Sequence, residues 1–159
     1  MKRFLALAIA LTMMAPALAR AQQIQVTPIS ARPSEVGAAR YFTGAVVIDP
    51  IFAVMPSTRA AGAQVTFAPG ARSAWHSHPA GQTLIVTSGL GWVQEWGGAS
   101  RAIRAGDVIW TPPGVKHWHG ASEGNGISHI AIQEAGNGEV VRWMEHVTDQ
   151  QYRSAAGTR

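Results

Sequence analysis

The chain has 159 residues, with 13 Lys plus Arg, 9 Asp plus Glu and no cysteine. After residue 21 there is no basic run of the kind that binds a phosphate backbone, so nucleic acid is not expected as a partner. The lack of cysteine excludes disulfides, and a chain of this size can bury the core of one domain without them.

Residues 1–21 have the pattern of a secretory signal peptide. Lys2 and Arg3 precede an apolar run over residues 4–14, and small residues follow at positions 19 and 21. The run is too short to cross about 30 Å of hydrocarbon, so we expect cleavage after Ala21 rather than a membrane anchor. The protein is therefore expected to be exported, to the periplasm or the medium, with no membrane association after cleavage.

The remainder is expected to form an N-terminal arm, one β domain and a C-terminal tail. Residues 22–40, with two prolines, are expected to be the extended arm. Residues 41–146 show no sustained 3.6-residue apolar period, which favours an all-β sandwich or barrel. Residues 147–159 are expected to be a tail with one short helix, which starts at Thr148 or Asp149 and stops at Gly157.

Within residues 41–146, short apolar stretches alternate with turn signals about every 8 to 12 residues. The turns include Ser88-Gly89, Gly97-Gly98 and Pro112-Pro113-Gly114. We predict strands at residues 45–48, 63–67, 83–86, 91–96, 108–110, 128–133 and 140–144.

Three histidines and a glutamine are spaced as metal ligands. His76 and His78 are two residues apart, so on a strand both rings project to one face. Gln82 lies just across the turn at residues 79–81, and His117 follows the turn at residues 112–114. Each signal is weak alone, and their combination indicates one metal site.

The spacing of these residues and of nearby glycines resembles the two motifs of the cupin superfamily. The matching positions are Gly70, His76, His78, Gln82 and Gly89, and then Gly106, Pro112, Gly114 and His117. The resemblance covers roughly residues 40–146. It implies a single-domain jelly-roll barrel, also called a double-stranded β-helix, with one divalent metal ion bound by His76, His78, Gln82 and His117.

Gln82 departs from the common pattern, because most cupins carry glutamate there; Ala121 departs too, where asparagine is usual. An amide ligand is neutral, so three neutral histidines and Gln82 would leave the charge of the ion uncompensated, which suits Lewis-acid chemistry. The alternative is that Gln82 is only a polar residue near a turn and that the ion has three protein ligands.

A narrower resemblance, to the bacterial cupin hydroxynitrile lyases, runs nearly the length of the chain that remains after residue 21. It is carried by residues 42–44, 71–76, 81–87, 116–120 and 143–149. It implies a manganese-type ion and reversible cleavage of a cyanohydrin, such as mandelonitrile, into an aldehyde and hydrogen cyanide. Iron, zinc, nickel or cobalt also suit such ligands, and family habit implies a homodimer or homotetramer.

Further residues are candidates for the reaction space. His119 shares the face of His117 on an extended strand and is our candidate catalytic base; the alternative is that it orients a ligand. Ala63, Val65, His129 and Gln133 are the expected substrate pocket, although His129 and Gln133 suit a buried hydrogen-bonded pair equally well. A metal-dependent dioxygenase and a non-catalytic cupin that binds a small ligand remain the alternative functions.

Overall fold

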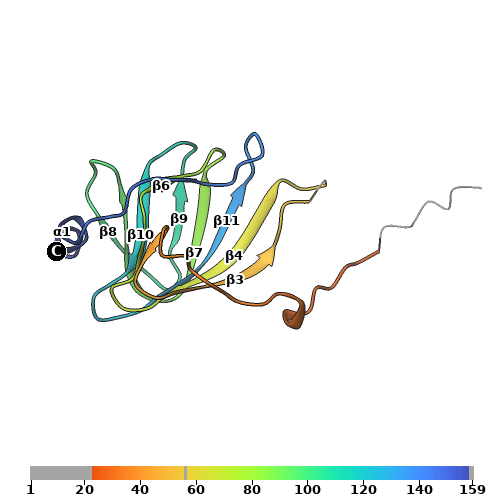
Figure 1. The fold of residues 1–159 in the computed structure, drawn as a ribbon, viewed down its shortest axis with the longest axis horizontal. Coiled ribbons are helices and arrows are strands. Elements are labelled where there is room, and N and C mark those ends of the chain that lie inside the picture. The colour runs from red at the N-terminus through yellow and green to blue at the C-terminus, as the bar shows by residue number, and fades with distance from the viewer. Residues whose placement is uncertain (1–22, 56, 158–159) are drawn as a thin grey trace, which may run out of the picture.

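The computed structural model describes residues 23–55 and 57–157. The expected signal peptide, residues 1–21, lies outside them. In the described part no helix has the length and apolar character needed to span a membrane. Strands dominate, as the sequence predicts, and they curl into a jelly-roll barrel (Figure 1).

The strands form one curled antiparallel sheet with two halves. One half contains β1 (Glu35–Val36), β3 (Val46–Phe52), β4 (Ala60–Phe67), β9 (Val108–Thr111) and β11 (Ile127–Glu134). The other contains β2 (Phe42–Thr43), β5 (Arg72–Ser73), β6 (His76–Ser77), β8 (Arg101–Arg104), β10 (His117–Ala121) and β12 (Arg142–Trp143). The long strand β7 (Gln82–Glu95) belongs to both halves, since its first part pairs with β9 and β11 and its second with β8 and β10.

The turn predicted at Ser88-Gly89 is wrong, because β7 runs through it. Gly89 instead bends the strand with a φ of +84°, a conformation that costs glycine little. A Cβ at this position would lie 1.9 Å from the carbonyl oxygen of Gly126. The glycine therefore allows β7 to pass closely beside the start of β11 as it crosses between the halves.

The barrel interior is filled by alternate residues of the paired strands, as period-2 geometry requires. Val65 lies opposite His129, which lies opposite Val86, and all three are buried. Phe67 and Leu84 extend the same core. One end of the barrel is thus closed by apolar packing, while inward residues closer to Gln82 surround a cavity.

The C-terminal helix α1 (Asp149–Gly157) begins as the sequence predicts. Thr148 Oγ1 accepts a hydrogen bond from Gln151 N at 3.1 Å, and Gln151 Oε1 accepts one from Thr148 N at 2.9 Å, which is a capping box. The buried guanidinium of Arg72 ties the helix to β5, because it donates to Val147 O and Asp149 Oδ1. At the other end of the chain the arm carries a short 3-10 helix, η1 (Ile29–Ala31).

Candidate metal centre

The three histidines predicted as ligands meet inside the barrel. His76 on β6 lies directly opposite His117 on β10, with ring centroids 4.3 Å apart. The His78 ring lies 5.1 Å from that of His76 and 5.6 Å from that of His117. Strand pairing therefore brings together two sequence segments that are about 40 residues apart.

The protein fixes the tautomer of each of these rings. The Nδ1 atoms of His76, His78 and His117 lie 2.9, 2.6 and 3.0 Å from the backbone oxygens of Ala74, Val140 and Val115. A carbonyl oxygen only accepts, so each Nδ1 carries the proton and each Nε2 presents a lone pair. This is the usual way in which proteins prepare histidines as metal ligands.

Gln82 completes the group with its side-chain oxygen. Its Oε1 lies 3.2 Å from His117 Nε2, while its Nε2 donates to Gln133 Oε1 at 3.5 Å. With His117 protonated at Nδ1, two lone pairs face each other across this distance. A cation between them would satisfy both atoms.

His119 lies beside the group and offers a second choice of third histidine. One group of three histidines, which does not include His78, has its possible metal-binding atoms within 4.8 Å of one another: His76, His117 and His119. His119 Nδ1 is already 3.2 Å from His129 Nε2, whereas the Nε2 of His78 is buried without a hydrogen-bond partner. Among the buried ring nitrogens of His76, His78, His117 and His119, His78 Nε2 is therefore the one without a hydrogen-bond partner in the described structure.

A cavity of about 160 Å³ opens beside these residues. The predicted pocket residues Ala63, Val65 and Gln133 line it, together with His119. His129 does not line it, because it lies behind His119. His129 and Gln133 are also not bonded to each other, since their partners are His119 and Gln82.

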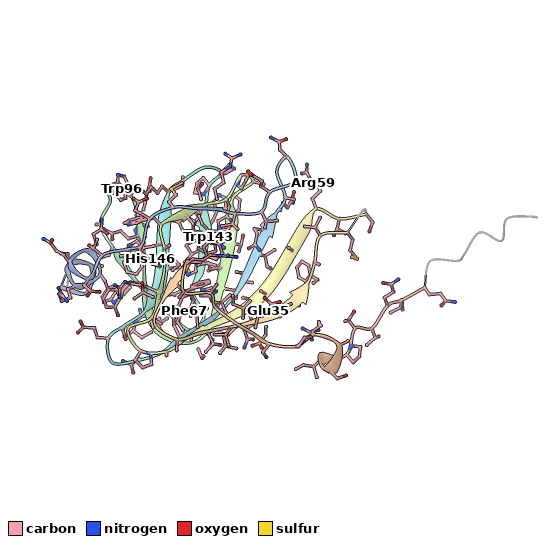
Figure 2. The ribbon with its side chains drawn as sticks, viewed as in Figure 1. Glu35, Arg59, Phe67, Trp96, Trp143 and His146 are labelled. Carbon is pink, nitrogen blue, oxygen red and sulfur yellow. The ribbon has the colours of Figure 1, made fainter. Side chains whose placement is uncertain are left out.

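Sequence reasoning missed an aromatic wall of this cavity. Phe42 and Trp143 line it, and Trp143 stacks on Tyr41 with ring centroids 4.6 Å apart and lies 4.9 Å from the His76 ring. Figure 2 labels Trp143 near the middle of the barrel. The sequence contained one sign of this wall, the apolar segment 140–144, which was predicted only as a strand. In the structure the strand β12 contains just two residues of that segment, and it pairs with β6.

Comparison with known proteins supports the architecture. Residues 63–130 match a family model described as a cupin domain. The chain is 54% identical over 130 residues to an (R)-mandelonitrile lyase of Granulicella tundricola, covering 82% of this chain and 99% of that protein. The chain belongs to the cupin family.

Solved structures agree with this assignment. A cupin-like protein from Thermotoga maritima is 38% identical, with a TM-score of 0.74 over 78% of this chain and 94% of that one. The polyketide cyclase RemF from Streptomyces resistomycificus shares the fold at 13% identity, with a TM-score of 0.64 over 82% of this chain and 92% of that one.

The electrostatics of the cupin site favour a metal over protons. Burial lowers the pKa of His76 and His117, and it lowers the pKa of His78 to about 4. Neighbouring imidazoles lower the pKa values of His76 and His78 further. The three rings are therefore neutral at pH 7, the form that binds a metal. The donor set fits a divalent ion.

No residue that lines the cavity is acidic, within the part of the chain that the structure describes. A divalent ion held by His76, His78, Gln82 and His117 would keep its full charge. Such a site favours an anion or a developing negative charge in the positions that the protein leaves open.

Proposed function

We propose that this cupin is a metal-dependent lyase that reversibly cleaves a cyanohydrin of the mandelonitrile type into an aldehyde and hydrogen cyanide. The observation that carries the proposal is the 54% identity, over 82% of the chain, to a protein named (R)-mandelonitrile lyase. The uncharged donor set beside an apolar cavity supports it. We further propose that the protein is exported, from the signal-like residues 1–21.

The proposed ligands are His76, His78, Gln82 and His117, and the proposed ion is manganese. When bound, the ion supplies a positive charge that stabilises negative charge on the substrate oxygen. Backbone carbonyls orient the three imidazoles, and Gln133 orients the Gln82 amide. The ligand positions are therefore set by the fold before any ion arrives.

His119 is the proposed base. Its Nδ1 is engaged with His129, which leaves Nε2 as the atom available on the side of the cavity. Burial and the neighbouring imidazoles, His129 first, lower its pKa well below the usual value, so the ring is neutral at pH 7 and can accept a proton.

The proposed reaction keeps the proton within the site. Nε2 of His119 takes the hydroxyl proton of the cyanohydrin, the carbonyl double bond forms, and the bond to the nitrile carbon breaks. Cyanide leaves with the electron pair of that bond. Return of the proton from His119 to cyanide gives hydrogen cyanide and restores the neutral base.

The cavity wall suits an aryl substituent. Phe42 and Trp143 offer aromatic faces on one side, and Ala63, Val65 and Ala131 leave space on the other. Aromatic rings prefer offset or edge-to-face contact with such faces. We propose that the substrate ring packs against Trp143, with its polar carbon directed to the histidines.

The test is the release of benzaldehyde from mandelonitrile by metal-free protein, by manganese-loaded protein and by a loaded His119→Ala variant. A general base contributes about 10²- to 10⁴-fold to the rate, so the cleavage rate of His119→Ala should fall by at least about 10²-fold. The control is His146→Ala, which alters an exposed histidine and should match the wild-type rate. Equal rates for wild type and His119→Ala would remove the proposed base. Turnover that stops under strict anaerobiosis would favour the dioxygenase alternative.

A further inference from the structure

The barrel wall is not closed between β8 and β9. Within the described residues both strands pair only with β7, β8 with its second part and β9 with its first. Arg101 at the start of β8 pairs with Val93, and Thr111 at the end of β9 pairs with Gln82. These partners lie near opposite ends of β7, so β8 and β9 separate and leave a gap in the wall.

A second cavity lies in this gap, and we call it the lateral cavity. Its volume is about 230 Å³, and its lining includes the buried ligand His117. The cavity beside Trp143 is lined by the other proposed ligands, and the two cavities have no lining residue in common. The proposed metal centre therefore borders two separate cavities.

Strand register shows that the lateral cavity belongs to the barrel interior. Glu95 lies directly opposite His117, and Thr111 lies directly opposite Gln82. Directly paired residues project to the same face of a sheet, and both His117 and Gln82 face inward. The side chains of Glu95 and Thr111 therefore start on the inner face as well, on the side of the centre away from Trp143.

Thr111 brings a hydroxyl without a partner to this cavity. The residue is only 5% exposed, and its side chain makes no hydrogen bond to any residue that the structure describes. The neighbouring Gln82 directs its amide to Gln133 and His117 instead. Buried hydroxyls normally have a partner, and one left without costs about 1 to 3 kcal/mol. A small molecule with a hydrogen-bonding group would supply the missing contact.

The remaining lining indicates the size and charge of that molecule. Glu95 and Arg101 are both exposed at the rim, so the charges there cancel and select neither a cation nor an anion. Ile109 contributes an apolar wall. The way inward passes between Thr111 and His117, which are 5% and 1% exposed. A small neutral molecule with one polar end suits this lining best.

We propose that the lateral cavity binds hydrogen cyanide and is the route by which it leaves and enters the site, while the aldehyde occupies the cavity beside Trp143. The inference rests on the proposed lyase function. The hydroxyl of Thr111 donates to the nitrogen of hydrogen cyanide, which is the acceptor end of that molecule. The two products then separate in different directions, and neither blocks the other.

Synthesis of mandelonitrile from benzaldehyde and hydrogen cyanide by the manganese-loaded protein tests the proposal. Thr111→Val removes the hydroxyl and keeps the shape. Loss of one hydrogen bond of about 0.5 to 1.5 kcal/mol should raise the KM for hydrogen cyanide about two- to tenfold, with the KM for benzaldehyde and kcat unchanged. Thr83→Val is the matched control, because Thr83 lies opposite Trp110 and lines neither cavity, and it should change neither KM.

A second variant fills the lateral cavity. Ile109→Phe enlarges a wall residue that is not near the proposed base, and its fold is checked by circular dichroism. The KM for hydrogen cyanide should rise more than in Thr111→Val, again with little change for benzaldehyde. Product inhibition of the wild type should follow a random order of release, whereas strictly ordered release would contradict separate routes.

Methyl NMR of zinc-loaded protein, with its metal content checked after each titration, gives a readout that needs no turnover. Hydrogen cyanide should shift the Thr111 methyl signal saturably, and benzaldehyde should shift that of Ala63 instead. A Thr111 signal that does not move, or an equal rise of both KM values in Thr111→Val, would overturn the inference. A Thr111 shift in a protein that does not cleave mandelonitrile would contradict the proposed function and leave the lateral binding site standing.

Discussion

The buried histidine cluster makes the stability of the metal-free protein depend strongly on pH. His78 and His129 have pKa values lowered to about 4, mainly by burial, whereas an unfolded chain has the ordinary value near 6.5. Between these two values the unfolded state binds more protons than the folded state. Stability contributed by the neutral rings is therefore present above pH 6.5 and is lost as the pH falls toward 4.

The size of this loss of stability follows from how far burial lowers the two pKa values. One pKa unit corresponds to about 1.4 kcal/mol, so each of the two groups should remove about 2 kcal/mol of unfolding free energy between pH 7.5 and pH 5. His76, His117 and His119, whose pKa values are also lowered, add to this loss. A small domain has only about 5 to 15 kcal/mol in total, so we expect acid unfolding of the metal-free protein above pH 4.

Urea denaturation at pH 7.5, 6.5, 5.5 and 5.0 measures the effect. The free energy of unfolding of the metal-free protein should fall by at least about 4 kcal/mol over this range, and His129→Leu should reduce the slope by about one proton. Manganese at a thousand times its dissociation constant should add about 4 kcal/mol at pH 7.5. An unfolding free energy that stays flat from pH 7.5 to 5 would refute the buried, neutral cluster.

Three further predictions concern the surroundings of the site. Arg72→Met should lower the unfolding free energy by about 2 to 3 kcal/mol, because it removes the buried hydrogen bonds that hold α1, whereas Arg142→Met, which breaks an exposed ion pair, should change it by less than about 1 kcal/mol in the same urea titration. Gly120→Ala should cost at least about 2 kcal/mol, since its Cβ would lie 2.5 Å from the carbonyl oxygen of Ala71; a thermal melt within 1 °C of the wild type would contradict that contact. Trp143→Ala should slow mandelonitrile cleavage more than tenfold and acetone cyanohydrin cleavage less, and equal losses would argue against the aromatic wall.

The part of the site that depends on local spacing could be predicted from the sequence. His76 and His78 project together because β-strand geometry demands it, and the turns before Gln82 and His117 return the chain to the same place. The orienting partners could not be predicted, since the carbonyl that fixes His78 belongs to Val140, 62 residues away. Its position depends on how the C-terminal segment crosses the barrel.

The strand β10 is absent from the strands predicted by apolar pattern, although the site argument placed His117 and His119 on an extended strand. The sequence of residues 117–121 does not alternate, and all five residues are buried. Both faces are covered, since His117 and His119 face the barrel interior while Trp118 packs with Tyr152 of α1. A strand covered on two sides loses the alternation by which sequence patterns reveal strands.

The most direct test of the account is an anomalous-scattering map at the manganese edge from crystals of the loaded protein. We expect one ion per chain, bound to Nε2 of His76, His78 and His117 and to Oε1 of Gln82, with His119 outside the ligand set. An ion bound by His76, His117 and His119, with His78 and Gln82 unliganded, would contradict the proposed centre and the role of His119 as base.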